Sequence, residues 1–450
     1  MTTIVAILVT LLWTAVMILD DSEFCYLWQL KEYRMDRMRE FLRSRQGKKY
    51  WKLGGSGIRH HPRHPVLTTK AVLLTLLAVA IETGILLITQ SWVIAIILFI
   101  LRFFLFSSIV ALFYLPTTLI KRWVIWRAHR VLLSYPQLLV IGVTGSYGKT
   151  TVKNFLAHIL SGTYNVIATP QHINTDIGVA KFILKTRFTA ADIFVVEMGA
   201  YRIGEIHTLC VMTHPTIGIL TAINAQHLSL FGSMKNIQQA KYELLRSLPT
   251  NGLAVTNADN SYCTEFISEL RAPSKLFHTE QAMQSTNLAP CLIVAKHLAV
   301  PDSIIEKQLK TLPPATLQLH RYGGATIIDD SYNSNPDGFL AALSVLNRTA
   351  KDKKCFVVTR GMLELGEKSD ALHQLIGEEI GRIVDTLFLI NRDAETALRA
   401  GIGSGKTQVE VYEKTEDLLH AVQALKNTPS VILVENRIPE VLQRELFHTV

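Results

Sequence analysis

Long apolar runs dominate the first 135 residues, and charged residues fall almost entirely between these runs. The runs at 4–19, 71–88 and 92–115 are each long enough, or nearly so, to cross a bilayer as a helix. Only a short polar turn separates the last two, which predicts a helical hairpin. The first run lacks the basic start and the small-residue cleavage site of a signal peptide. We therefore expect a membrane region at 1–135, with three helices and a basic loop at 22–66.

The distribution of charge predicts the orientation of these helices. The loop at 22–66 holds eleven Lys/Arg against four Asp/Glu, and 121–130 adds four Lys/Arg without an acid, in a chain of net charge +9. Basic residues that flank apolar spans mark the cytoplasmic side. We therefore expect a multi-pass protein of the cytoplasmic membrane, with everything after residue 121 in the cytoplasm. The expected partner of the basic segments is inner-membrane lipid, and not nucleic acid.

Two further features of this region predict structure. Apolar residues recur at helical spacing between arginines, and they are Phe24, Leu27, Trp28, Met38, Phe41 and Leu42. This pattern is typical of a basic amphipathic helix on an anionic leaflet, although a solvated helix between domains is the alternative. Within the hairpin, Glu82 and Arg102 fall at similar depth, and we expect them to form an ion pair that locks it.

From residue 136 onward, short β-branched segments alternate with amphipathic helical segments. Strands are expected at 192–197, 216–221, 325–328 and 354–359, after a strand and helix at 138–160. This alternation predicts an α/β fold with a largely parallel sheet, in two domains at 136–312 and 313–450. The five cysteines are scattered without a C-x-x-C pair, so neither a disulfide framework nor a zinc site is indicated.

The segment 138–151 predicts a nucleotide site. An apolar strand runs into a glycine-rich turn that opens a helix at 152–160. The backbone N–H groups of such a turn, with the positive end of the helix, bind phosphate. Lys149 is expected to reach the β- and γ-phosphates of a triphosphate, and the Thr150 hydroxyl to bind Mg²⁺. A chance Gly-Lys-Thr in a loop is the alternative. The candidate contacts of the nucleotide in this turn are Gly145, Ser146, Tyr147, Gly148, Lys149, Thr150 and Thr151.

Three other polar residues stand where the chemistry of this site would need them. Glu197 ends a buried strand, and a carboxylate at the carboxyl edge of the sheet can reach a Mg²⁺ beside the phosphate loop. His227 follows another strand, and Lys241 is expected at the start of a helix. The alternatives are ordinary buried polar residues for Glu197 and His227, and a surface lysine for Lys241.

Several motifs in the same order carry a resemblance to a known family. They are Asn174-Thr-Asp-Ile-Gly178, Glu197-Met-Gly-Ala, His227-Leu-Ser-Leu-Phe-Gly, Ala240-Lys241, Asn257-Ala-Asp, Asp329-Asp-Ser-Tyr-Asn-Ser-Asn-Pro336 and Met362-Leu-Glu-Leu-Gly-Glu367. Over 137–450 the chain resembles the Mur ligases, which form amide bonds at the expense of ATP. Within that family it is most similar to the branch that adds D-Ala-D-Ala to the muramoyl tripeptide.

The resemblance implies roles for individual residues. Thr150 and Glu197 would hold one Mg²⁺, and His227 would help to hold a second beside a carbamylated Lys241. The residues implied around the nucleotide are Asn174, Asn287, Asp330, Tyr332 and Asn333. The implied substrates are ATP, a peptidoglycan-precursor peptide, and an amino acid or dipeptide.

The chain also departs from the family pattern. Membrane helices stand where the family has a domain for the UDP of its substrate. Met283-Gln284 replaces a His-Asn that packs on adenine, and Pro314-Ala-Thr316 lacks a phosphate-contacting arginine, which Arg321 could replace. Arg360-Gly361 stands for Gly-Asp. Glu435-Asn-Arg-Ile-Pro439 stands for a Lys-Gly-Ser-Arg that helps to bind the incoming amino acid.

These observations predict a membrane-anchored ATP-dependent peptide ligase of cell-wall precursor metabolism, with altered substrate recognition. Two alternatives remain open at this point. One is a membrane-tethered ATP-binding protein that does not ligate and serves as a scaffold or regulator of wall synthesis. The other is a ligase for a different polymer, such as polyglutamate.

Overall fold

The computed structural model describes residues 2–43, 47, 64–171, 173–278, 283–312, 318–331 and 335–447, with the backbone alone at 2–11, 283–286 and 318. The chain divides into two compact units, Met1–Trp123 and Val124–Val450. We describe each unit by itself.

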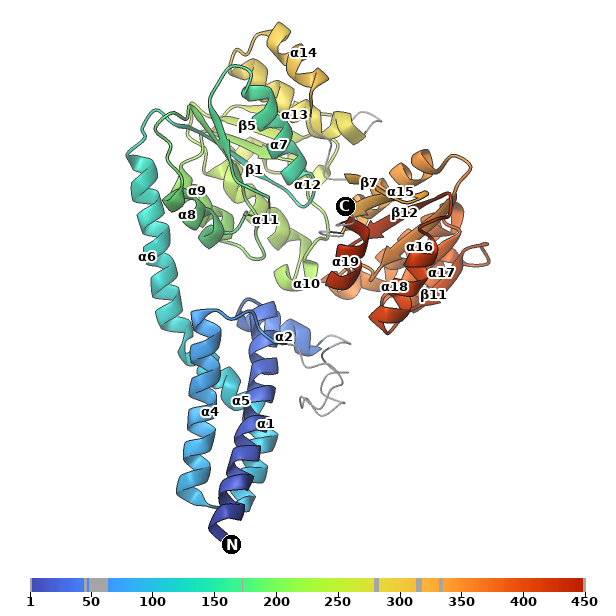
Figure 1. Cartoon of the computed structure of the whole chain (residues 1–450). Helices are drawn as coiled ribbons and strands as arrows, with labels where there is room; N and C mark the ends of the chain where they lie inside the picture. The colour runs from blue at the N-terminus through green and yellow to red at the C-terminus, as the bar shows by residue number, and fades with distance from the viewer. Residues whose placement is uncertain are drawn as a thin grey trace. The chain divides into compact units, whose positions relative to one another are not determined.

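The amino-terminal unit is built from helices. They are α1 (Thr2–Leu30), α2 (Met35–Arg43), α4 (Thr69–Thr89), α5 (Trp92–Leu112) and the start of α6 (Tyr114–Leu133) (Figure 1). The Thr68 hydroxyl accepts a hydrogen bond from the backbone of Ala71 (3.2 Å) and so begins α4. Gln90 ends α4 in the left-handed conformation (φ 45°), at the turn of the predicted hairpin. Side chains from α1, α4 and α5 share one apolar core that includes Phe24, Leu74 and Phe106.

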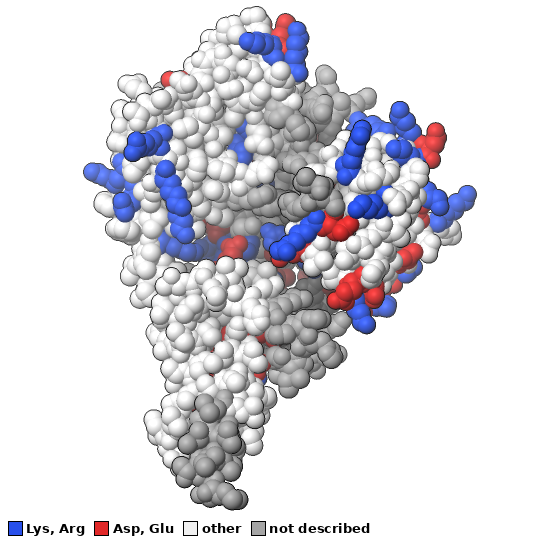
Figure 2. All heavy atoms as spheres, in the orientation of Figure 1, with Lys and Arg blue, Asp and Glu red and all other residues white. Residues whose placement is uncertain are grey.

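Within the described residues, two helical segments are long and apolar enough to cross a membrane, Thr69–Thr89 and Trp92–Leu133. They cover the second and third predicted spans, and the last of these continues through α6. The exposed side chains of these helices are mostly apolar, and the lower part of Figure 2 shows a largely uncharged surface. Membrane insertion of these helices stays a proposal, because it is inferred from their length and composition.

The structure corrects three expectations in this unit. The helix expected at 4–19 continues to Leu30, so the segment 22–66 is not a loop throughout. The expected amphipathic helix is broken after Leu30, because Glu32 and Tyr33 adopt positive φ angles (55° and 54°) before α2 begins. Arg102 pairs with Asp20 and not with Glu82, since the longer α1 brings this carboxylate to the guanidinium.

The second unit contains two six-stranded sheets, which confirms the α/β class. The first sheet has the order β2-β3-β1-β4-β5-β6 with all strands parallel. Its strands are β1 (Leu139–Thr144), β2 (Val166–Ala168), β3 (Ile193–Glu197), β4 (Ile217–Leu220), β5 (Leu253–Asn257) and β6 (Ser274–Phe277). All are short, and all except β6 contain β-branched residues; β3, β4 and β5 are fully buried, as expected for a parallel sheet covered on both faces.

Helices cover both faces of this sheet. One face packs against α7 (Lys149–Leu160), α13 (Met283–His297) and α14 (Asp302–Lys310). The other packs against the end of α6, α8 (Asp176–Lys185), α9 (Glu205–Thr213) and α11 (Met234–Arg246). The short helices α10 (Leu228–Phe231), α12 (Ser261–Thr264) and η1 (Ile267–Glu269) lie in its loops. β1 lies between β3 and β4, so the loops after these three strands meet at one edge.

The second sheet has the order β11-β10-β9-β12-β8-β7, and only the pair β7–β8 is antiparallel. Its strands are β7 (Gln318–Tyr322), β8 (Ala325–Asp330), β9 (Lys354–Thr359), β10 (Thr386–Leu389), β11 (Gln408–Val411) and β12 (Ser430–Glu435). Its helices are α15 (Pro336–Ala350), η2 (Gly366–Lys368), α16 (Ser369–Ile383), α17 (Glu395–Ile402), α18 (Thr415–Ala424) and α19 (Glu440–Phe447). The domain limits 136–312 and 313–450 stay predictions.

Two helix boundaries differ from expectation. Lys241 lies in the interior of α11 and not at its start, because Ser233 caps the helix and accepts a hydrogen bond from the backbone of Asn236 (3.1 Å). The helix after the phosphate loop begins at Lys149, three residues before the expected start.

Candidate functional site

The turn between β1 and α7 has the geometry of a phosphate-binding loop. Gly145 and Gly148 have positive φ angles (148° and 78°), which other residues rarely adopt. A Cβ at Gly145 would lie 2.0 Å from the Thr221 hydroxyl oxygen, so only glycine fits there. The Lys149 ammonium donates to the carbonyls of Gly145 (2.8 Å) and Ser146 (3.0 Å) and therefore lies over the turn. The loop thus brings a helix start and a cation to one place.

The neighbouring strand holds this loop in position. Ser146 donates its backbone N–H to the carbonyl of Ala222 (2.7 Å), and its hydroxyl accepts from the backbone of Asn224 (3.0 Å). Thr221 donates its hydroxyl proton to the carbonyl of Tyr147. A Cβ at Gly148 would lie 2.7 Å from the side-chain oxygen of Asn287, which places Asn287 against the loop.

Glu197, at the carboxyl end of β3, is enclosed by polar partners. Its carboxylate accepts from the Thr150 hydroxyl (2.9 Å) and the Asn174 amide (3.0 Å), and the Lys153 ammonium lies 3.6 Å away. The backbone N–H of Glu197 donates to the Thr169 hydroxyl (3.0 Å). The predicted pair of Thr150 and Glu197 is therefore in direct contact. A hydroxyl and a carboxylate beside a phosphate loop are oxygen ligands that suit Mg²⁺.

Lys153 belongs to the site but is not among the residues predicted from the sequence. It is fully buried, and its ammonium also donates to the carbonyl of Thr169 (2.7 Å). Burial lowers its pKa, and the charge of Glu197 opposes that shift. Its position among Val152, Phe155 and Leu156 on the buried face of α7 was the available signal, because a buried lysine requires a partner.

His227 stands just before α10 with a positive φ of 60°. Its Nδ1 lies 2.5 Å from a carboxylate oxygen of Glu364, and its ring contacts Tyr201 edge to face at 4.7 Å. Burial lowers the pKa of His227, while Glu364 opposes that shift. A neutral imidazole that donates from Nδ1 keeps its lone pair on Nε2, which is the form that binds metals. The motif Met362-Leu-Glu-Leu-Gly-Glu367 contains Glu364, but no local pattern indicates this contact with His227.

Lys241 is buried, with 4% of its surface exposed. Burial and, to a smaller extent, the charge of Lys149 lower its pKa to about 7, while Glu205 and Glu243 oppose this shift. Lys241 therefore lies within electrostatic range of the phosphate loop and has a neutral amine at a pH where lysine is normally charged.

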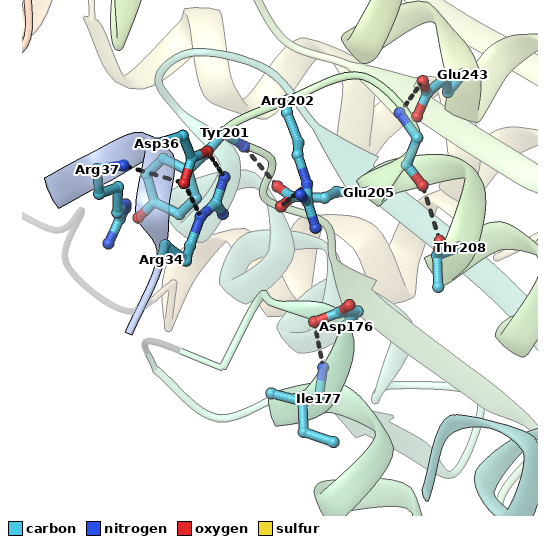
Figure 3. A network of polar contacts seen from close by, with 11 residues as sticks. Arg34, Asp36, Arg37, Asp176, Ile177, Tyr201, Arg202, Glu205, Thr208 and Glu243 are labelled. Atoms are coloured by element: carbon cyan, nitrogen blue, oxygen red, sulfur yellow. Dashed lines mark hydrogen bonds and ion pairs between the residues drawn. The ribbon is translucent and has the colours of Figure 1, made fainter. Parts of the chain in front are cut away.

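Hydrogen bonds fix the loop that carries Tyr201 (Figure 3). The Glu205 carboxylate accepts from the backbone of Tyr201 (2.7 Å) and from Arg202 (3.1 Å). The Glu243 carboxylate accepts from the backbone of Gly204 (2.5 Å). The two acids whose charges act on Lys241 therefore both accept hydrogen bonds from this loop.

Asp330 ends β8 beside Glu435, the last residue of β12. Burial raises the pKa of Asp330, and the hydrogen bond with Glu435 opposes this. The Asn224 amide, after β4, donates to the side-chain oxygens of Asn335 (3.1 Å) and Asp337 (2.5 Å). Thr151 is buried at the start of α7. Tyr332, Asn333 and Thr316 lie outside the described residues.

In the part of the chain that the structure describes, no group of three or more His, Cys, Asp or Glu residues could hold a metal ion. The hydroxyl of Thr150 and the carboxylate of Glu197, the ligands predicted for a first Mg²⁺, are in direct contact. The second predicted site has His227 and Lys241 within electrostatic range of each other. The metal ligands stay predictions.

Comparison with known proteins agrees with this geometry. The Mur ligase middle domain matches residues 143–289, and the Mur ligase glutamate ligase domain matches residues 317–435. Together these matches cover more than half of the chain, with the phosphate loop, Glu197, His227 and Lys241 in the first of them. The chain belongs to the Mur ligase family.

The chain is similar to individual members of this family in sequence and in fold. The UDP-N-acetylmuramoyl-tripeptide–D-alanyl-D-alanine ligase of Synechocystis sp. is 30% identical over 302 residues, which are 60% of this chain and 65% of that protein. The chain thus spans less than two thirds of this relative's length. The fold is similar to MurF from Acinetobacter baumannii, with a TM-score of 0.63 and 23% identity over 72% of this chain and 79% of the other. It is also similar to MurF ligase from Thermotoga maritima in complex with ADP, with a TM-score of 0.61 and 24% identity over 72% and 82%.

The contacts of Lys149 lead to a prediction about nucleotide turnover. Lys149→Ala removes the one ammonium that lies over the loop, and we expect a loss of at least about 100-fold in ATP turnover, the usual effect of removing one electrostatic contact to a transition state. Steady-state phosphate release measures it. Lys181→Ala, an exposed lysine of α8, is the control. Turnover near wild type in Lys149→Ala with unchanged melting would contradict the assignment of the loop.

Proposed function

We propose that this chain is an ATP-dependent amide ligase that acts on a peptidoglycan-precursor peptide. ATP would phosphorylate a substrate carboxylate, and an amine would then attack the acyl phosphate to form the amide. The observation that carries this proposal is the contact of Thr150 with Glu197 (2.9 Å) at the loop covered by Lys149. The names of the Mur ligase relatives, and the ADP in the Thermotoga maritima MurF structure, support ATP and this reaction class.

The chemistry needs little covalent help from the protein. Lys149 would neutralise charge on the transferred phosphoryl group, and the loop would hold the triphosphate in line with the attacking carboxylate. Thr150 and Glu197 would hold Mg²⁺, which neutralises charge on the triphosphate when it is bound. Glu364 would act as a positioning residue that orients His227 toward a second ion.

The charges around Lys241 support its carbamylation. Lys149 and Lys241 lie within electrostatic range of each other. A charged ammonium on Lys241, in addition to that of Lys149, would repel a metal ion bound beside them. The neutral amine can attack carbon dioxide, which forms a C–N bond, releases one proton and leaves a carbamate. This converts a cation into an oxygen ligand of the kind that Mg²⁺ prefers. The pKa of about 7 makes the neutral amine available at physiological pH.

Substitution of Lys241 tests this step. We expect Lys241→Ala and Lys241→Arg to be equally inactive, because neither can form a carbamate, and a short-chain carboxylic acid to restore part of the activity of Lys241→Ala. Wild-type activity should rise with pH through about 7 as the amine loses its proton. Lys235→Arg, an exposed lysine of the same helix, is the control. Full activity in Lys241→Arg would refute the carbamate and favour a protein that binds ATP without ligating.

A membrane anchor is the second part of the proposal. The apolar helices Thr69–Thr89 and Trp92–Leu133 support it. On α6, Trp123 and Trp126 are 54% and 56% exposed within the basic segment 121–130, as in the aromatic and basic belt at a cytoplasmic membrane face. An anchored ligase with membrane helices where the family pattern has a UDP-binding domain would suit a lipid-linked acceptor.

Fractionation of cells tests the anchor. We expect the full chain to stay in the membrane pellet after washes with high salt and alkaline carbonate, and to be released by detergent, because spanning helices resist both washes. Release by high salt alone would show that the protein binds the surface through its basic residues and does not span the bilayer.

A substrate screen tests the ligase itself. Purified full-length protein would be assayed for phosphate release with UDP-linked and with lipid-linked muramoyl peptides, each with D-Ala-D-Ala and single amino acids. We expect amine-dependent release with a lipid-linked peptide, and a product that is longer by the added residue in mass spectrometry. Glu435, where the family has a lysine, favours the alternative of a non-ligating ATP-binding scaffold. ATP binding without any amide product would support that alternative.

A further inference from the structure

The helical unit buries a group of charged side chains that the proposed ligase reaction does not use. Asp20 and Asp21 lie on α1, Glu82 on α4 and Arg102 on α5, and each is at most 3% exposed. These helices otherwise pack through apolar side chains. Charged groups in such surroundings require compensation or must become neutral.

Asp20 and Arg102 compensate each other. The Arg102 guanidinium forms an ion pair with the carboxylate of Asp20. It also lies over the ring of Phe99 at 4.3 Å, and its Nη1 lies 3.8 Å from the sulfur of Met17. The positive charge of Arg102 is therefore committed to Asp20.

Asp21 and Glu82 have no such compensation. Asp21 is 0% exposed and Glu82 is 1% exposed. Within the described part of the chain, none of their four carboxyl oxygens has a hydrogen-bond partner. The charge of Asp21 interacts with those of Glu82, Arg102 and Asp20, so all of these groups lie in one cluster.

The other titratable groups on these helices do not supply the missing positive charge. Glu23 on α1 is a further acid, and Cys25, also on α1, is a neighbour of Asp21. Lys70, the remaining basic residue of α4, has its ammonium over the ring of Tyr33 at 4.1 Å. Two ionised carboxylates would thus face a single guanidinium that already has its counter-ion. Buried carboxyl groups in this position take up protons instead.

We propose that Asp21 and Glu82 form a proton-binding pair inside the helical bundle. Each carboxylate takes one proton from water and becomes a carboxylic acid, and it returns the proton when the bundle opens. We favour protons over a metal ion, because the third acid of the cluster, Asp20, is already paired with Arg102, which leaves two carboxyl groups beside a cation. The proton-binding pair does not depend on the ligase reaction, so a result that contradicts one proposal does not contradict the other.

Neighbouring aspartates give a matched test in the full-length protein reconstituted in lipid nanodiscs. Asp21→Asn and Glu82→Gln mimic the protonated groups, so we expect little change in melting temperature at neutral pH. Asp20→Asn leaves Arg102 without its partner and should lower the melting temperature at every pH. The folded pair holds protons that unfolded carboxyls release, so wild-type stability should be complete at acidic pH and fall as the pH rises. In the double variant Asp21→Asn/Glu82→Gln, the stability should no longer fall as the pH rises.

Infrared spectroscopy of the wild type gives a reading that does not depend on whether a variant folds. We expect the C=O band of protonated carboxylic acids at neutral pH, weaker in each single variant and weakest in the double variant. Absence of the band in wild type would overturn the proposal. Its loss on adding NaCl or MgCl₂ at constant pH would also overturn it, because the site would then bind a metal cation. Equal destabilisation by Asp20→Asn and Asp21→Asn would show that Asp21 is ionised.

Discussion

The carboxylate of Glu197 is enclosed at the end of β3, and the arrangement of the phosphate loop depends on how its charge is balanced. A buried carboxylate without partners costs several kcal/mol, and Lys153 supplies the opposite charge at 3.6 Å. Lys153 belongs to α7, and Thr150 lies three residues earlier on the same face of that helix. The ion pair therefore ties α7 to β3 and brings the Thr150 hydroxyl to the same carboxylate. The place where the loop can hold a phosphate follows from this one contact between helix and strand.

On the other side of the loop the charges are not balanced. Lys149, Lys241 and His227 lie within each other's electrostatic range, and burial lowers the pKa of all three. Among these bases, His227 has an acid in direct contact, which is Glu364. Such a cluster of bases is favourable only beside an anion, and a triphosphate or a carbamate would supply one. The electrostatics of the site are therefore those of a protein that binds a multiply charged anion, and a buried neutral amine is a consequence of the same imbalance.

Much of this site could be predicted from local patterns. The glycine turn, Lys149 and Thr150 form one continuous motif, and the contact of Glu197 with Thr150 follows from the rule that parallel strands end at one edge. Lys153 and Glu364 were missed because their partners lie far away in the sequence. The position of Lys241 was misjudged because the cap at Ser233 starts α11 early. Arg102 was paired with the wrong acid because depth along a hairpin does not place a third helix beside it.

The departures from the family pattern gather at the carboxyl edge of the second sheet. Asp330 and Glu435 end adjacent parallel strands opposite each other, and Arg360 follows the neighbouring strand β9. In the family a lysine stands where this chain has Glu435, so a basic side chain has become an acidic one beside a retained aspartate. Burial raises the pKa of Asp330 to about 7, so this carboxyl group takes up a proton more readily than an exposed one. A substrate that approaches this edge would meet an acidic group where the resemblance predicts a basic one. We therefore expect these differences to affect recognition of the amine more than phosphoryl transfer.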